Sequence, residues 1–207
     1  MARYRTRSWR ALDVSAIAGG AVAGRGSAGT TPAQRSAPPR PVPAVHVRIL
    51  GLDPGSRRTG FGVIECHGPD YRHVAHGCIA VGALEVAERL RIIFESLQAL
   101  ITEHGPGEIA VEKVFVNRNV ESALKLGQAR GAALCAVPQG VPVFEYAPRA
   151  IKLALVGSGA AEKVQVAHMI KTLLGLDGKI SPDASDALAI AVCHAHTRRL
   201  HQLAAST

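Results

Sequence analysis

Four acidic residues occur where the sequence predicts that a strand ends or a helix begins. Asp53 follows the apolar segment 47–52 and precedes Pro-Gly, which favours a tight turn, and Glu112 ends a second short apolar segment. Asp183 and Asp186 are three residues apart at the start of a mostly apolar helix, so they share one of its faces. Carboxylates that converge cannot all stay ionised without a cation, and oxygen ligands favour Mg²⁺ or Mn²⁺. Two such ions about 3.5–4 Å apart are the usual means of hydrolysing a phosphodiester.

Each of these acids also has a simpler structural explanation. Aspartate is common in turns, so Asp53 could serve only to form its turn. Asp183 lies in the first turn of the expected helix, where the helix dipole stabilises a negative charge. Asp186 is harder to explain in this way, because it precedes a segment, residues 187–192, that must be buried on most sides. We therefore expect Asp186 to have a partner.

The first half of the domain is expected to contain an antiparallel three-stranded unit, a helix and a fourth strand. These elements are expected at residues 47–52, 59–64, 71–81, 84–104 and 108–112. The rules for crossover connections place the fourth strand parallel to the first and beside it. Asp53 and Glu112 would then stand at the same edge of the sheet.

The second half is expected to be mainly helical. Its elements are a helix at 119–137, a strand at 141–146 and helices at 147–156, 160–174 and 182–200. Asn119 and Ser181 are the expected N-caps. The first of these helices would place Val120, Leu124 and Leu134 on one face. The chain is therefore assigned to the α/β class, with a five-stranded mixed sheet flanked by helices.

Residues 1–45 differ in composition from the rest of the chain. They contain seven arginines and one acidic residue, Asp13, which accounts for +6 of the formal net charge of +8 and leaves +2 for residues 46–207. Their high content of Arg, Ala, Gly, Ser and Pro, without the periodicity of a helix or strand, indicates a disordered extension. A transit peptide, a weak signal sequence and an untranslated segment are alternatives. Residues 46–207 are the expected single domain.

The cysteines and the hydrophobic pattern bear on the cellular location. The four cysteines, at positions 66, 78, 135 and 193, include no Cys-x-x-Cys pair, so neither a zinc site nor a disulfide framework is indicated. A reducing cytoplasm is the expected location. No apolar run approaches the roughly 18 residues of a membrane span, so no membrane association is expected. Cys193, His194 and His196 lack matching ligands in the sequence and are interpreted as the tail of the last helix rather than a soft-metal site.

Three motifs occur in order between residues 47 and 200. They are Leu-Gly-Leu-Asp-Pro-Gly-Ser-Arg-Arg-Thr-Gly-Phe-Gly, then Val-Glu-Lys-Val-Phe with Ser-Ala-Leu-Lys-Leu-Gly-Gln-Ala-Arg-Gly, and finally Asp-Ala-Ser-Asp-Ala-Leu-Ala-Ile-Ala. Together they resemble the RuvC family of Holliday junction resolvases. The resemblance implies an RNase H-like fold and a homodimer that makes paired symmetric nicks across a four-way DNA junction during recombination and repair.

The resemblance also implies roles for the acidic residues. It implies that Asp53, Glu112 and Asp186 are catalytic, and that these three and Asp183 bind two Mg²⁺ ions, for which Mn²⁺ can substitute. This assignment agrees with the interpretation drawn from the residues alone.

Further residues are implied to contact DNA. Lys152 and Lys163 match basic residues near the scissile phosphate, and Phe115 matches an aromatic residue that stacks on a base at the junction centre. Arg118 and Arg130 are additional candidates for phosphate contact. Taken alone, the lysines could be ordinary surface residues and Phe115 a core residue. The resemblance also implies the RuvA–RuvB branch-migration complex as a partner, and it leaves residues 1–45 without a counterpart.

Three other interpretations are considered. The acidic set alone also fits a different RNase H-like nuclease or a transposase. Gly-Leu-Asp-Pro-Gly-Ser resembles the first phosphate loop of actin-like nucleotide-binding proteins, although this chain is too short for the second lobe that they need. A non-catalytic junction-binding protein is the third, and it is disfavoured because buried carboxylates without a metal would only destabilise the fold.

Overall fold

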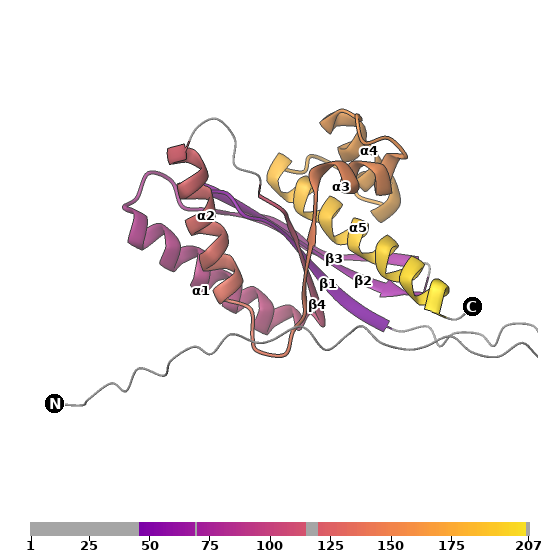
Figure 1. Cartoon of the computed structure of the whole chain (residues 1–207), viewed down its shortest axis with the longest axis horizontal. Helices are drawn as coiled ribbons and strands as arrows, with labels where there is room; N and C mark the ends of the chain where they lie inside the picture. Colours follow the sequence, from indigo (N-terminus) through magenta and orange to yellow (C-terminus); the bar gives the residue numbers. More distant parts are fainter. Residues whose placement is uncertain (1–45, 69, 115–119, 206–207) are drawn as a thin grey trace, which may run out of the picture. The chain divides into compact units, whose positions relative to one another are not determined.

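The computed structural model describes residues 46–68, 70–114 and 120–205 (Figure 1). Within these residues the predicted elements occur in the predicted order, and only their ends differ. They are β1 (His46–Asp53), β2 (Arg58–His67), β3 (Asp70–Ala80), α1 (Val86–His104), β4 (Glu108–Glu112), α2 (Val120–Cys135), β5 (Val143–Tyr146), α3 (Pro148–Val156), α4 (Lys163–Leu174) and α5 (Pro182–Ala205).

The strands form one mixed sheet in the order β3-β2-β1-β4-β5. β1, β2 and β3 form the predicted antiparallel unit, with Asp53 opposite Gly60 at one end of the β1–β2 ladder. β4 pairs in parallel with β1, and Leu52 lies opposite Val111. Each of these two residues precedes an acid, so Asp53 and Glu112 stand side by side at the same edge, as predicted.

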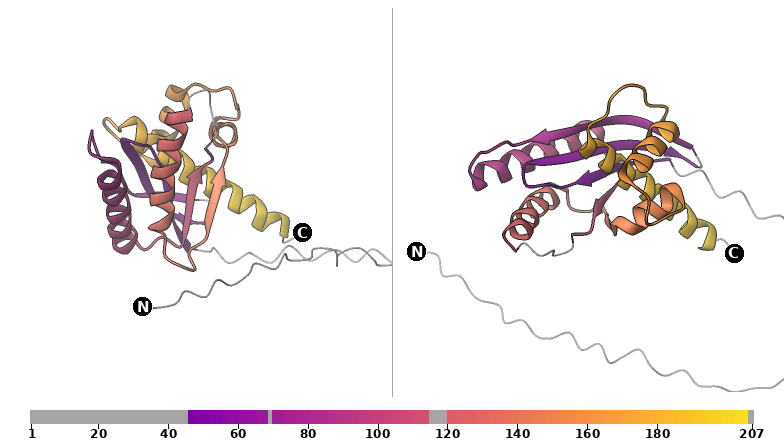
Figure 2. Two further views of the ribbon diagram at one scale, coloured as in Figure 1. Left: turned by 60° about the vertical axis from the view of Figure 1, so that its left-hand side comes forward. Right: turned by 90° about the horizontal axis from the view of Figure 1, so that it is seen from above.

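Helices cover both faces of the sheet (Figure 2). Neighbouring residues of a strand point to opposite faces, and β1 uses both. Ile49 belongs to a buried cluster with residues of α3, α4 and α5. Leu50 belongs to a second cluster with residues of α1 and α2. The central strands are therefore buried on both sides, which explains why β1 is a nearly continuous apolar segment.

Glycines in β1 and β2 allow α5 to lie directly on the sheet. A Cβ at Gly51 would stand 2.1 Å from the carbonyl oxygen of Ala187, and one at Gly60 would stand 2.0 Å from that of Asp183. Both separations are far below van der Waals contact, so only glycine permits this approach. Gly60 is also the residue opposite Asp53 in the β1–β2 ladder, so this contact places the first turn of α5 beside the end of β1.

Local interactions set the ends of the helices. Ser181 caps α5 as predicted, because its Oγ accepts a hydrogen bond from the backbone N–H of Ala184 over 3.3 Å. α4 begins later than expected, since Glu162 and Gln165 form a capping box. The expected N-cap Asn119 lies outside the described residues.

The apolar face predicted for α2 is largely exposed. Val120 and Leu124 are 74% and 61% exposed, and the buried residues of α2 are Ala129 and Ala133. The residues of α2 that pack with α1 are therefore mainly small, with Leu134 partly buried beside them.

Two further features are the state of the cysteines and the length and hydrophobicity of the helices. All four cysteines lie in the described residues and are free thiols. Among the described helices, none combines the length and the apolar character that crossing a membrane requires.

Candidate active site

The four predicted carboxylates converge where β1 and β4 end and α5 begins. Asp53 is the last residue of β1 and Glu112 the last of β4, and the other two lie at the start of α5. Burial is the main cause that raises the pKa of Asp53 to about 7, and the charges of the other three carboxylates raise it further. Burial and the charge of Asp186 likewise raise the pKa of Glu112. The acids are thus close enough to oppose one another's ionisation.

Two basic side chains contact the acids of α5. Lys163 Nζ donates a hydrogen bond to Asp186 Oδ2 over 2.9 Å, which is the main cause that raises the pKa of this lysine. Arg58 Nε donates to Asp183 Oδ2 over 2.8 Å. Within the described part of the chain, the two strand-end acids take part in no ion pair. Asp53 and Glu112 therefore lack a direct basic partner, although the charge of Lys163 partly offsets the rise in the pKa of both.

Glu112 lies between two surface pockets. One is lined by Glu112 and Asp186 together with Lys152 and Lys163, and apolar residues of α3, α4 and α5 form its wall. The other is lined by Asp53, the turn that follows it and Glu112. A phosphate group in the first of these pockets would meet both carboxylate oxygens, which can bind cations, and the two lysine ammonium groups.

The predicted DNA-binding residues differ in where the structure places them. Lys152 and Lys163 line the same pocket as Glu112 and Asp186, and their assignment to DNA binding stays a prediction. Arg130 forms an ion pair with Glu145, and its side chain is only 18% exposed. Phe115 and Arg118 lie outside the described residues, so their assignments stay predictions.

Sequence reasoning missed Arg58 as the partner of Asp183. The two residues are 125 positions apart, and nothing in their local patterns indicates a contact. The available signal was the Arg-Arg pair that follows the Asp-Pro-Gly-Ser turn, because a basic residue beside a predicted acidic site is a natural partner for it.

His194 belongs to the core. It is 2% exposed, and its Nε2 lies 2.7 Å from Glu108 Oε2 while its Nδ1 lies 2.6 Å from the Tyr146 hydroxyl. Burial is the main cause that lowers its pKa. His196 contacts the carbonyl oxygen of Ala154. These partners agree with the interpretation of residues 193–196 as part of the last helix rather than as a metal site.

Comparison with known sequences identifies the family. The family model described as "Crossover junction endodeoxyribonuclease RuvC" matches residues 49–194. RuvC of Methylococcus capsulatus is 54% identical over 153 residues, which cover 73% of this chain and 92% of that protein. RuvC of Alkalilimnicola ehrlichii is 55% identical over 150 residues, which cover 72% of this chain and 91% of that protein.

Solved structures agree with this match. Thermus thermophilus RuvC in complex with Holliday junction substrate is 35% identical, with a TM-score of 0.71, over 75% of this chain and 97% of that one. The yeast mitochondrial Holliday junction resolvase Ydc2 is 11% identical, with a TM-score of 0.53 over 77% of this chain and 85% of that one, and thus shares the fold. The RNase H-like fold is confirmed, and the chain belongs to the RuvC family of crossover junction endodeoxyribonucleases.

Proposed function

We propose that the crossover junction endodeoxyribonuclease activity of this chain depends on two Mg²⁺ ions held by Asp53, Glu112, Asp183 and Asp186. The observation that carries this proposal is the position of the four carboxylates, at the adjoining ends of β1 and β4 and at the start of α5, together with the rise of the pKa of Asp53 to about 7. A group of acids that oppose one another's ionisation is costly in a fold unless cations bind it. The activity itself, resolution of Holliday junctions in recombination and repair, follows from the family.

The donor atoms fit Mg²⁺. All four side chains offer carboxylate oxygens, the ligand type that Mg²⁺ and its substitute Mn²⁺ prefer over softer metals. When bound, two such ions assist attack of water on the phosphorus and stabilise the leaving oxygen, which yields 5′-phosphate and 3′-hydroxyl ends. We assign catalytic roles to Asp53, Glu112 and Asp186, and a supporting role in metal binding to Asp183.

The basic residues prepare the site for an anionic substrate. Lys163 holds Asp186 through its ammonium group, and Arg58 holds Asp183. Both carboxylates are therefore oriented before metal or DNA binds, which reduces the cost of assembling the site. Lys152 and Lys163, which line the same pocket as Glu112 and Asp186, would attract the scissile phosphate and orient it toward the acids.

Cleavage of a synthetic four-way junction tests the proposal. The wild-type chain with Mg²⁺ should make paired symmetric nicks, and Asp53→Asn should bind the junction but not cleave it. Linear duplex and RNA–DNA hybrid serve as control substrates. Preferred cleavage of the hybrid would support the different RNase H-like nuclease, and full activity of Asp53→Asn would overturn the site assignment.

The nuclease should act as a homodimer through α2. A junction offers two equivalent strands to be nicked, whereas the described residues form one such acidic site, so paired nicks would need two copies. The exposed side chains of Val120 and Leu124 form an apolar surface on α2, and Gly127 and Gly131 leave room for a second backbone to approach. Leu124→Glu should convert the dimer into a monomer in analytical ultracentrifugation; an unchanged sedimentation coefficient would exclude this face.

The other assignments rest on the family resemblance. Phe115 would stack on a base at the junction centre, Arg118 would contact a phosphate, and the RuvA–RuvB complex would deliver the junction in the cytoplasm. Residues 46–207 would form the nuclease domain. Removal of residues 1–45 should then leave cleavage unchanged; a lower affinity with a weaker salt dependence would instead show that the arginine-rich segment binds DNA.

A further inference from the structure

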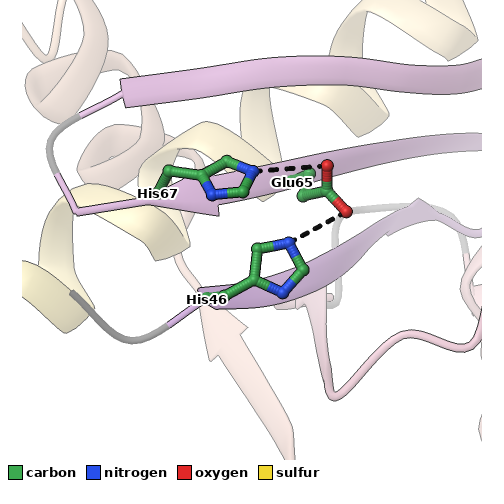
Figure 3. Close-up of side chains that lie close together, drawn as sticks. All are labelled: His46, Glu65 and His67. Atoms are coloured by element: carbon green, nitrogen blue, oxygen red, sulfur yellow. Dashed lines mark hydrogen bonds and ion pairs between the residues drawn. The ribbon is translucent and has the colours of Figure 1, made fainter. Parts of the chain in front are cut away.

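Two imidazoles and one carboxylate converge at the end of the β1–β2 ladder opposite to Asp53 (Figure 3). His46 and His67 face one another across the two strands. Glu65 precedes His67 by two residues and therefore points to the same face of the sheet. His46 Nε2 lies 3.0 Å from Glu65 Oε1, and His67 Nε2 lies 3.4 Å from Glu65 Oε2. The three potential ligand atoms all lie within 4.8 Å of one another.

Glu65 is fixed in place before any ligand binds. Arg48 Nη2 donates a hydrogen bond to Glu65 Oε1 over 2.8 Å. This bond is the main cause that lowers the pKa of Glu65 to about 2, so the side chain is an ionised carboxylate. Its side chain is only 12% exposed, whereas those of His46 and His67 are 54% and 53% exposed. The cluster thus combines a rigid anionic ligand with two imidazoles that can rotate.

We propose that His46, Glu65 and His67 bind a zinc ion or another late first-row divalent metal. Two imidazole nitrogens and one carboxylate oxygen with an open fourth position are a donor set that suits Zn²⁺. Ligands around tetrahedral zinc are about 3.4 Å apart, given metal–ligand distances of about 2.1 Å. The present separations require only rotation of the exposed imidazoles. Arg48 orients the carboxylate from behind, as residues that support metal ligands commonly do.

This site differs from the acidic site in both place and chemistry. The two lie at opposite ends of the same ladder, seven residue pairs apart, which corresponds to roughly 23 Å. The acidic site offers only oxygen atoms, which suit Mg²⁺, whereas imidazole nitrogens favour zinc and neighbouring metals. A metal here would join the first residue of β1 to the last residue of β2. It would therefore stabilise the sheet where the chain enters the domain.

Zinc binding to the full chain in excess Mg²⁺ tests the proposal. The variant His46→Ala/His67→Ala removes two exposed ligands but keeps the Arg48–Glu65 pair, so it should fold. Calorimetric titration should show one zinc ion fewer for this variant than for the wild type. At zinc about 100 times its Kd, the Tm of the wild type should rise by about 5–10 °C, and the variant should lose this rise.

A second histidine pair provides a matched control. His76 Nδ1 lies 2.7 Å from His73 Nε2 on β3, and the variant His73→Ala/His76→Ala should keep the zinc ion and the rise in Tm. Zinc should also shift the imidazole NMR signals of His46 and His67. Equal zinc binding by the wild type and by His46→Ala/His67→Ala, or unshifted signals of these two residues, would overturn the proposal. Junction cleavage in Mg²⁺ should be the same in both proteins, which separates this site from the proposed catalytic one.

Discussion

The two ends of β4 place the same kind of side chain in opposite situations. Glu108, at the start of the strand, accepts a hydrogen bond from Arg198 Nε over 2.9 Å and lies 2.7 Å from His194 Nε2. Glu112, at the end of the strand, takes part in no ion pair within the described residues and has a raised pKa because of burial and Asp186. Glu108 has a cation, Arg198, and an imidazole as partners, whereas Glu112 has a neighbouring carboxylate.

This difference separates the end of β4 that stabilises the fold from the end at which we propose that the reaction takes place. At the Glu108 end, as at Glu65, each carboxylate is matched by basic side chains of the chain itself. At the Glu112 end, four acids meet two basic partners, and both partners contact only the acids of α5. A fold tolerates such an excess of acid where an external cation completes the set.

The largest effect on cleavage is expected when Glu112 is replaced by glutamine, and the same substitution at Glu108 is the control. Glu112→Gln should lower the rate of junction cleavage by about 1000-fold, or about 4 kcal/mol, because it removes a proposed metal ligand. Glu108→Gln removes the same charge from the same strand and should cleave normally under conditions in which it is folded. The comparison fails if the two variants lose activity equally.

Stability should respond in the reverse order. Glu108→Gln leaves His194, which is 2% exposed, and Arg198 without their anionic partner. We expect this variant to lose about 2 kcal/mol of unfolding free energy in urea titrations. Glu112→Gln should not be destabilised in metal-free buffer, because it relieves repulsion from Asp186. A stable Glu108→Gln variant would show that the partners at this end contribute little.

The pH dependence of the metal-free protein should reveal the cost of the acidic site. The pKa of Asp53 is about 7 in the fold and 3.8 as its ordinary value, so the native state holds more protons than the unfolded state between these limits. Unfolding free energy should therefore fall as the pH rises from 4 to 7. At pH 8 in EDTA, Asp53→Asn should be more stable than the wild type by about 2 kcal/mol. Added Mg²⁺ should raise the Tm of the wild type and not that of the variant.

The smallest of these effects is expected for Lys163, which contacts Asp186. Lys163→Gln removes the hydrogen bond to Asp186 and the positive charge in the pocket, and should lower kcat by about tenfold. Lys163→Arg keeps the charge and should recover part of the loss. If the substitution raised KM alone, Lys163 would serve in DNA binding without orienting Asp186.

The sequence predicted features that depend on local patterns. Asp53 and Glu112 end apolar strands, and two antiparallel strands followed by a crossover helix lie between those strands, so their placement at one edge followed from connection rules. The glycine, serine and proline signals likewise located most ends of helices. The acidic set could therefore be assembled without coordinates.

Other features depend on contacts between distant segments and had no local signal. Arg58 meets Asp183 only because β2 lies beneath the start of α5, and His194 meets Glu108 because α5 crosses the start of β4. The exposure of Leu124 could not be predicted either, since an apolar helical face is the same in sequence whether it contacts a core or a second chain.

Gly60 lies beneath the backbone of Asp183 and has no functional group of its own. Any larger residue there would have to push the first turn of α5 away from the strand, because even a methyl group would overlap the Asp183 carbonyl oxygen. A random mutagenesis screen scored by junction cleavage would therefore rank this glycine with the carboxylates. In such a screen, a residue without a side chain would look catalytic, although its contribution is to let the first turn of α5 pack closely against β2.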